Sequence, residues 1–164
     1  MSGESKIPIA SVAFVCTANL CRSLMAQAIF DAEAKHRKMV VKTLSAGLSD
    51  FEGMMAIREA RLACERHETP MQKLISTFIE RTDLSAATRV FVVERSHMQF
   101  LTNTGRVSPD RVQLLGDHDP MHRGAEIDDP TGMDSAAFDA CHELMRDCIR
   151  HYLDATNELP QAYD

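Results

Sequence analysis

One stretch near the start, residues 9–23, limits the fold more than any other part of the chain. Residues 9–15 read Ile-Ala-Ser-Val-Ala-Phe-Val, a nearly continuous apolar run that is typical of a strand buried on both faces. The run stops at Cys16, and from Ser23 onward apolar residues recur at helical spacing, as in Leu24 and Ala28. A strand, a short loop and a helix in this order predict a parallel sheet covered by helices.

The rest of the chain repeats this alternation. We expect three more strands, at residues 40–44, 89–94 and 112–115. The first helix should end near residues 36–38, and others are expected at residues 53–67, 71–80, 96–103 and 135–155. The fold class is therefore α/β, a single three-layer domain with a four-stranded parallel sheet flanked by helices on both faces. The domain should span residues 1–164, with a core over about residues 9–155 and loose ends at 1–6 and 159–164.

Composition excludes several classes of function. The net charge of −6 argues against nonspecific binding to nucleic acid, which requires a basic surface. No apolar run approaches the roughly 20 residues of a membrane span, and the first residues do not resemble a signal peptide. The five cysteines are an odd number, which fits free thiols in a reducing compartment. We therefore expect a cytoplasmic protein with no membrane and no nucleic-acid partner.

The loop after the first strand has the residues of a phosphate site. Backbone N–H groups and a helix N-terminus near Arg22 would together hold an anion. The guanidinium of Arg22 matches two phosphate oxygens, and Cys16 at the loop entrance would be a nucleophile aimed at phosphorus. Ser23 would donate to the sulfur of Cys16, and Asn19, which tolerates left-handed backbone angles, would brace the loop.

These residues carry a resemblance to a known family. The chain resembles the low-molecular-weight protein-tyrosine phosphatases, whose signature is Cys-x-Gly-Asn-x-Cys-Arg-Ser. Here the signature stands as Cys16-Thr17-Ala18-Asn19-Leu20-Cys21-Arg22-Ser23. Further matches lie in order along the chain over residues 12–153: Met25-Ala26, Ser45-Ala46-Gly47, Glu94-Arg95-Ser96-His97, Leu114-Leu115-Gly116 and Asp128-Asp129-Pro130.

The resemblance implies a mechanism and a set of site residues. Cys16 would form a phosphocysteine, and the family's acid, the Asp before Pro, is Asp129, with Asp128 as second choice. No metal and no cofactor would be needed, because the loop and Arg22 already neutralise the phosphate charge. The substrate would be a phosphotyrosine-containing protein, such as a tyrosine kinase. The residues expected to contact the substrate are Thr17, Ala18, Asn19, Leu20, Cys21 and Ser23.

The resemblance also implies two supporting roles. Cys21 would form a reversible disulfide with Cys16 that protects the nucleophile, although a small buried packing residue is the alternative. Ser45 would donate a hydrogen bond to Asn19, although an ordinary residue at a strand end is the alternative.

Three positions bear on loop shape and substrate. Ala18 replaces the family's Gly, which would cost about 1 kcal/mol if the backbone there needs a positive φ. Leu20 favours phosphotyrosine, because a Thr there goes with the related branch that acts on phosphoarginine. Thr131 stands where many members have an aromatic residue. Three alternatives stay open: a phosphoarginine phosphatase, a noncatalytic phosphate-binding module, and an arsenate reductase-like redox enzyme, a class that shares this loop and for which Cys64 would be the relay thiol.

Other polar and sulfur-containing residues have ordinary explanations. Cys141 and Cys148, seven positions apart on a predicted helix, indicate a core stripe rather than a metal site. His118 and His122 are expected to be surface residues of a long loop. His97, after the third strand, is expected to pack or cap a helix.

Overall fold

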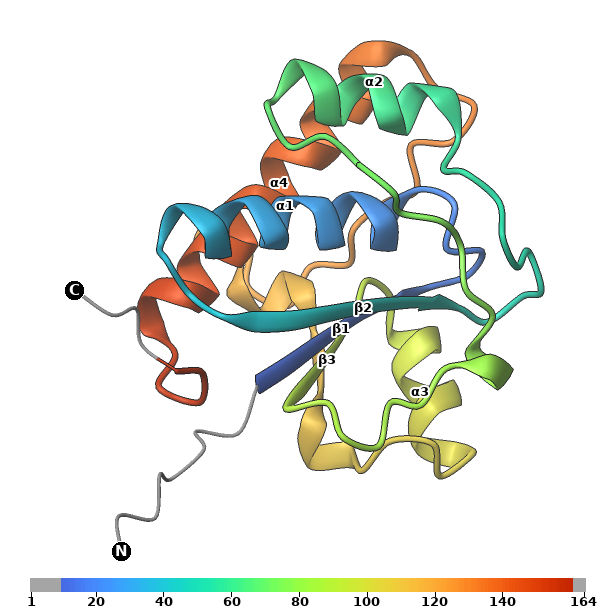
Figure 1. The fold of residues 1–164 in the computed structure, drawn as a ribbon, viewed down its shortest axis with the longest axis vertical. Coiled ribbons are helices and arrows are strands. Elements are labelled where there is room, and N and C mark those ends of the chain that lie inside the picture. The colour runs from blue at the N-terminus through green and yellow to red at the C-terminus, as the bar shows by residue number, and fades with distance from the viewer. Residues whose placement is uncertain (1–9, 161–164) are drawn as a thin grey trace, which may run out of the picture.

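The computed structural model describes residues 10–160, which form one parallel sheet covered by helices on both faces (Figure 1). The strands β1 (Ala10–Cys16), β2 (Val41–Gly47), β3 (Arg89–Val92) and β4 (Val112–Leu114) are arranged in the order β2-β1-β3-β4. The helices are α1 (Arg22–His36), α2 (Arg58–Arg66), α3 (Arg95–Asn103) and α4 (Ser135–Ala155). The predicted fold class, a three-layer α/β domain, is confirmed.

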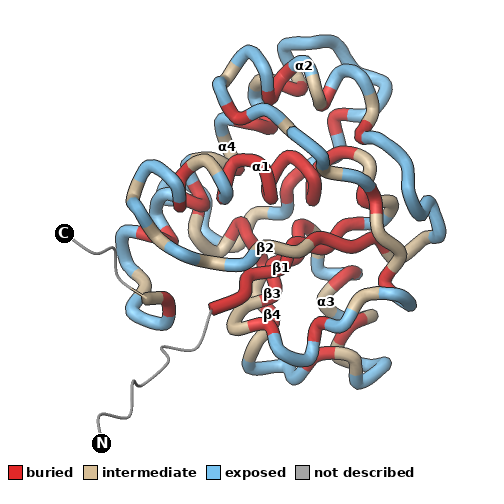
Figure 2. The backbone as a smooth tube through the Cα atoms, viewed as in Figure 1, coloured by how far each residue is buried: buried red, intermediate tan, exposed pale blue. Residues whose placement is uncertain are grey.

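The central strand β1 separates two hydrophobic cores. Its residues are all buried, as the apolar run predicted (Figure 2). Alternate side chains of a strand point to opposite faces. Accordingly, Val12 and Phe14 join the core under α1, α2 and α4, whereas Ala13 and Val15 join the core under α3. Because both faces are packed, β1 fixes the position of the loop that follows Cys16.

Helix α1 is buried on almost all sides, since it lies between the sheet and α2 and α4 (Figure 1). Lys35 and His36 stand in its last turn, where positive charge suits the helix dipole, and the helix ends as predicted. Helix α4 begins after Asp134, whose carboxylate accepts from the backbone N–H of Ala137 at 3.0 Å. These helices place the N-terminus of α1 at the carboxyl edge of the sheet.

The sequence prediction was wrong over residues 53–57 and 71–80. Helix α2 starts five residues later than the predicted boundary of 53, and the second segment contains only a short 3-10 turn, Ile79–Arg81. Met55 and Ile75 instead form an antiparallel bridge, and the N–H of Ser76 donates to the carbonyl of Met54 at 2.8 Å. Two segments with helical composition thus pair with one another through contacts between distant residues, which local periodicity does not report.

Several boundaries also differ. Strand β2 continues through residues 45–47, and β3 and β4 end at residues 92 and 114, earlier than expected. The predicted loose end begins too early, because Leu159 is buried in the core. Residues 1–9 and 161–164, which include the rest of both predicted ends, lie outside the described residues. Within residues 10–160, no helix is long and apolar enough to cross a bilayer.

Candidate active site

The thiol of Cys16 lies at the carboxyl end of β1, where ligands bind in parallel α/β sheets. Cys16 is buried, and its sulfur has two hydrogen-bonding neighbours in the following loop. The backbone N–H of Asn19 donates to it at 3.3 Å, and the hydroxyl of Ser23 lies 2.9 Å away. Both contacts suit a negatively charged sulfur. The predicted partnership of Ser23 with the thiol is therefore present.

Asn19 holds the loop in shape from behind. Its φ of 56° is left-handed, as predicted for a residue that must tolerate this region, and its side chain is fully buried. The side-chain amide donates to the hydroxyl of Ser23 at 2.6 Å, and the side-chain carbonyl accepts from the backbone N–H of Thr77 at 2.8 Å. The expected hydrogen bond from Ser45 is not the one observed, because its hydroxyl donates to Gln27 at 2.6 Å. Thr77 takes the supporting role predicted for Ser45.

The backbone of the loop packs directly on Gly47, the last residue of β2. A Cβ at Gly47 would lie 2.6 Å from the carbonyl carbon of Ala18 and 2.9 Å from the nitrogen of Asn19, closer than real contacts allow. Ala18 itself is not among the residues with positive φ in the described chain. The substitution of Ala for the family's Gly therefore does not carry the left-handed backbone cost considered from the sequence.

The guanidinium of Arg22 is buried and held by two neighbours. Its Nη1 donates to Glu94 at 2.9 Å and to the carbonyl of Ile127 at 2.7 Å. Burial acts to lower the pKa of Arg22, but the hydrogen bond to Glu94 and the nearby charge of Cys16 outweigh it and raise the pKa. Arg22 therefore stays charged beside the thiol, with Nη2 directed toward Asp129 Oδ2 at 3.9 Å.

His97 links the loop to this ion pair. Its Nε2 lies 2.9 Å from the hydroxyl of Thr17 and 3.3 Å from Glu94 Oε2. Burial lowers the pKa of His97, as does the charge of Arg22, while Glu94 opposes the shift. The neutral ring therefore bridges Thr17 and Glu94. From the sequence, His97 was expected to pack or to cap a helix, and its contact with Thr17 of the loop was not predicted.

Asp129 reaches the site from the long loop before α4. Its side chain is 49% exposed, and Oδ1 accepts from the backbone N–H of Thr131 at 3.0 Å and from the Thr131 hydroxyl at 2.7 Å. The other oxygen, Oδ2, faces Arg22. Asp128, the second choice from the sequence, does not line the cavity that contains Cys16. Of the two candidate aspartates, Asp129 is therefore the one that lines the cavity with Cys16.

A cavity of about 340 Å³ joins these groups. The residues that line it are Cys16, Thr17, Ala18, Leu20, Cys21, Arg22, Ile57, Glu94, Asp129 and Thr131. Two residues expected to contact substrate, Asn19 and Ser23, are not part of the lining and lie fully buried behind the loop. The structure therefore separates the predicted loop residues into a wall that faces the cavity and a support behind it.

The remaining sulfur and imidazole groups lie elsewhere. Cys141 and Cys148 belong to the core under α4, as predicted. Burial raises the pKa of Cys64 to about 11, and Cys64 is inaccessible in the same core. His118 is half-buried rather than a plain surface residue, since its Nε2 lies 2.7 Å from Gln113 Oε1. Within residues 10–160, no group of three or more His, Cys, Asp or Glu side chains could hold a metal ion.

Sequence reasoning missed Glu94, Ile57 and Thr77 as parts of the site. Glu94 follows β3 at the same edge of the sheet as Cys16, so the topology of the predicted sheet could have indicated it. Ile57 and Thr77 belong to the two segments that were predicted as helices. Their placement depends on the pairing between those segments, for which the sequence has no local signal.

Comparisons with known proteins identify the family of the chain. The family described as low molecular weight phosphotyrosine protein phosphatase matches residues 11–162. A low molecular weight protein-tyrosine-phosphatase of Streptomyces coelicolor is 29% identical over 158 residues, covering 90% of this chain and 93% of the relative. The crystal structure of such an enzyme from T. tengcongensis is 25% identical with a TM-score of 0.82, covering 90% of this chain and 99% of the other.

The buried thiol, the paired arginine and the neighbouring carboxylate are those of a cysteine-dependent phosphomonoester hydrolase. The chain belongs to the low molecular weight protein-tyrosine phosphatase family. The fold alone does not define the phosphorylated group, because a solved structure called YwlE arginine phosphatase is also similar. It has a TM-score of 0.76 and 24% identity, covering 90% of this chain and 99% of the other.

Proposed function

We propose that the protein hydrolyses phosphotyrosine through a phosphocysteine intermediate. The single observation that carries this proposal is the environment of the Cys16 sulfur. It lies 3.3 Å from the N–H of Asn19 and 2.9 Å from the hydroxyl of Ser23, in a cavity that Arg22 and Asp129 also line. Donors directed at a thiol sulfur favour the thiolate, which is the nucleophilic form.

In the first step, the Cys16 thiolate attacks phosphorus while Arg22 binds two non-bridging oxygens of the phosphate. Asp129 protonates the bridging oxygen, so that the alcohol leaves and the phosphoryl group remains on sulfur. In the second step, Asp129 accepts a proton from a water molecule as that water attacks phosphorus. The sulfur then leaves as a thiolate that Ser23 stabilises, and inorganic phosphate is released. Preorganised donors and the charge of Arg22 supply the electrostatic stabilisation of both transition states.

The walls of the cavity support an aromatic substrate. Leu20 and Ile57 line it and present apolar surface to a substrate. Thr131 replaces a potential aromatic wall, and Phe51 does not line the cavity. The two apolar side chains would contact a tyrosine ring on its faces. The physiological substrate would be a phosphotyrosine-containing protein.

Parallel kinetics on peptides that carry phosphotyrosine, phosphoarginine or phosphoserine test this proposal. We expect kcat/KM for phosphotyrosine to exceed the others by at least about tenfold, which corresponds to about 1.4 kcal/mol of discrimination. Cys16→Ser should abolish turnover on every peptide. Substantial turnover by Cys16→Ser would reject the mechanism, while a preference for phosphoarginine would reject only the substrate.

An arsenate reductase and a noncatalytic phosphate-binding module would each give a different result in solution. An arsenate reductase would oxidise thioredoxin in the presence of arsenate, but Cys64, its proposed relay thiol, is buried and has a raised pKa. A noncatalytic module would bind phosphopeptides tightly without turnover by the wild type. Dephosphorylation without arsenate-dependent oxidation would exclude both.

We further propose that Cys21 protects Cys16 by forming a disulfide with it after oxidation. Cys21 lines the same cavity, although burial raises its pKa and its thiol contacts Met25 Sδ at 3.8 Å. The test is hydrogen peroxide inactivation followed by dithiothreitol. Wild type should recover activity, and Cys21→Ala should recover much less. Equal recovery would assign Cys21 to packing alone.

A further inference from the structure

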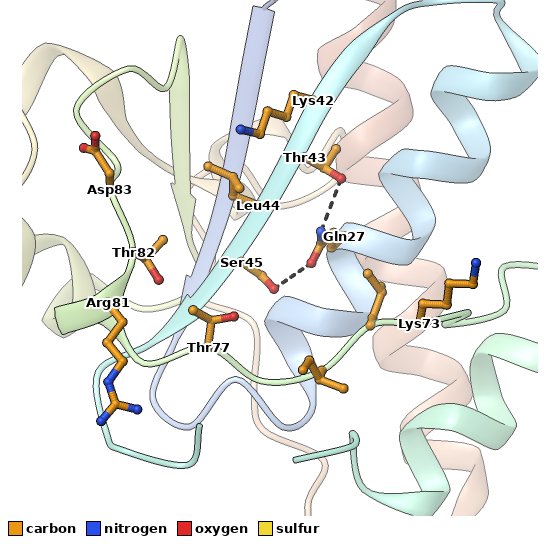
Figure 3. A pocket seen from close by; sticks show the side chains of 12 residues that line it. Gln27, Lys42, Thr43, Leu44, Ser45, Lys73, Thr77, Arg81, Thr82 and Asp83 are labelled. Carbon is orange, nitrogen blue, oxygen red and sulfur yellow. Dashed lines mark hydrogen bonds between the residues drawn. The ribbon is translucent and has the colours of Figure 1, made fainter. Parts of the chain in front are cut away.

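A second groove, larger than the phosphate cavity, lies beside the outer edge of β2. It has a volume of about 380 Å³. Strand residues 42–45 form one wall, and parts of the segment 73–83 form the other, with Gln27 of α1 at one end (Figure 3). The residues that line it do not overlap with those of the phosphate cavity. The proposed phosphatase reaction does not use this groove.

The strand that forms one wall has an open edge. Strand β2 is the outermost strand of the sheet: β1 pairs with one side of it, and on the other side only Gly47 is paired, through an isolated parallel bridge with Phe78 in the described chain. The N–H of Gly47 points away from β1, since it donates to the carbonyl of Thr77 at 2.9 Å. Alternate residues of a parallel strand direct their backbone groups to the same side, so Thr43 and Ser45 direct theirs into the groove.

These outward backbone groups have no backbone partner. Among residues 10–160, no backbone hydrogen bond joins Thr43 or Ser45 to the opposite wall. Gln27 donates to the Thr43 hydroxyl at 3.3 Å and accepts from the Ser45 hydroxyl at 2.6 Å (Figure 3). The Thr43 hydroxyl donates in turn to Asp31 at 2.6 Å. What remains free is a row of backbone donors and acceptors. Such a row binds another extended chain.

The charges around the groove define what kind of chain would fit. Three exposed cations, Lys42, Lys73 and Arg81, line it, and none forms an ion pair within the described chain. The one acidic residue of the lining, Asp83, already accepts from the N–H of Ser85 at 2.9 Å and from its hydroxyl at 2.6 Å. On a chain with a net charge of −6, this is a local concentration of positive charge.

The alternative is that the cations only protect the edge. Lysine on an edge strand discourages pairing with another chain. However, only Lys42 belongs to the strand, whereas Lys73 and Arg81 come from the opposite wall. Apolar surface is also present in the groove, since Leu44 and the half-exposed Ile75 line it. Cations contributed by both walls, together with this apolar surface, favour the binding of an acidic chain over simple protection of the edge.

We propose that this groove binds an extended acidic segment of a partner protein, which adds to the sheet as a fifth strand beside β2. Backbone hydrogen bonds to Thr43 and Ser45 would hold the segment, and its carboxylates would face Lys42, Lys73 and Arg81. Pairing along residues 42–45 spans about 10 Å, or three to four residues of the segment. The segment needs no phosphate, so this site is independent of the phosphatase reaction.

The test uses a fluorescein-labelled peptide of alternating Glu and Val, seven residues long, measured by fluorescence anisotropy. We expect Lys42→Glu/Lys73→Glu to raise its Kd at least about tenfold. The matched control, Lys38→Glu/Arg123→Glu, makes the same change in net charge at exposed positions outside the groove and should change Kd less than about twofold. Thermal unfolding by circular dichroism verifies that both variants fold.

Two further peptides test the pairing itself. A version that is N-methylated at alternate residues cannot donate to the strand and should lose binding, and a version with Lys in place of Glu should not bind. The amide NMR signals of Thr43 and Ser45 should shift with the Glu peptide. Equal binding of the N-methylated peptide, equal effects of the two double variants, or no binding at about 1 mM peptide would each overturn the proposal.

Discussion

The nucleophile and the acid of this site are held in contrasting ways. The loop that carries Cys16 connects β1 to α1, and it is braced from behind by the fully buried Asn19 and Ser23. The loop that carries Asp129 lies on the surface. Its buried anchor is Ile127, whose N–H donates to the carbonyl of Val93 at 3.0 Å.

This difference predicts which substitutions should change the stability of the fold and which should change only the catalytic rate. Removing a buried, hydrogen-bonded group leaves unpaired polar atoms and a void, so changes in the Cys16 loop should affect both folding and rate. Asp129 is half exposed and contacts its own loop through Thr131, so a change there should affect rate alone. Arg22 follows the Cys16 loop and donates to the carbonyl of Ile127 in the Asp129 loop, so it connects the two regions. It also donates to Glu94.

Apart from loss of the nucleophile itself, the largest expected effect is that of Asp129→Asn, which keeps the shape of the side chain and removes the acid. We expect kcat on a phosphotyrosine peptide to fall about 10²- to 10⁴-fold, the usual contribution of a positioned acid. The fall should be smaller for p-nitrophenyl phosphate, whose leaving group needs less protonation. The free energy of unfolding should change by less than about 0.5 kcal/mol.

Asp128→Asn is the matched control for this change. It alters the adjacent carboxylate, which is exposed and does not line the cavity, and should leave kcat nearly unchanged. If Asp129→Asn keeps the wild-type rate and Asp128→Asn is slow, then Asp128 and not Asp129 is the catalytic acid.

Arg22→Lys should lower kcat/KM by about 10²- to 10³-fold, because an ammonium cannot bind two phosphate oxygens in one plane. It should also lower stability, because Lys cannot reach Glu94 and the carbonyl of Ile127 with the same geometry. Steady-state kinetics and urea unfolding measure the two effects. If Arg22→Lys has normal stability and normal kinetics, the guanidinium is needed neither for binding phosphate nor for connecting the two loops.

Asn19→Ala should lower the free energy of unfolding by about 2–4 kcal/mol, since it removes the partner of the Thr77 N–H and replaces Asn, which tolerates a positive φ, with a residue that tolerates it less well. Displacement of the loop should lower kcat/KM about 10- to 100-fold. Asn19→Gly separates the two causes, because glycine restores the backbone freedom and not the hydrogen bonds. If both variants are as stable as wild type, the hydrogen bonds of the Asn19 side chain do not stabilise the loop.

The same contrast explains which parts of the site could be predicted. The strand, loop and helix around Cys16 are contiguous in sequence, so hydrophobic periodicity and the signature of the loop locate Arg22, Asn19 and Ser23. The contacts of Ser23 with Cys16 and with Asn19 span seven and four positions along the chain. Asp129 is far away in sequence, and only the resemblance to a family identified it.

The residues that were missed depend on contacts between distant segments. Thr77 contacts Asn19 across 58 positions, and His97 contacts Thr17 across 80. The misassigned helix at residues 71–80 hid Thr77, because a helix there would not have placed its N–H against the loop. The position of β2 at the edge of the sheet could not be predicted either, because strand order follows from tertiary packing and not from the strand's own residues.

The smallest expected effect concerns His97, which supports the buried region from α3. Burial lowers the pKa of His97, so below a pH of about 6.5 the unfolded chain binds a proton that the folded chain does not. Stability should therefore be complete above that pH and fall as the pH decreases, by at most about 1.4 kcal/mol per pH unit for this group. His142, whose pKa burial lowers to about 3, contributes a fall of the same sign.

The contribution of His97 to the pH dependence of stability is measured by comparing His97→Gln with wild type, and His36→Gln is the control. Urea unfolding of His97→Gln between pH 7 and 5.5 should show a shallower loss of stability than wild type, while the exposed His36→Gln should match wild type. Glutamine can still donate to Thr17 or Glu94, so most of the activity at pH 7 should remain. Identical slopes in all three proteins would mean that folding does not change the pKa of His97, and burial would then not disfavour the charged form of its ring.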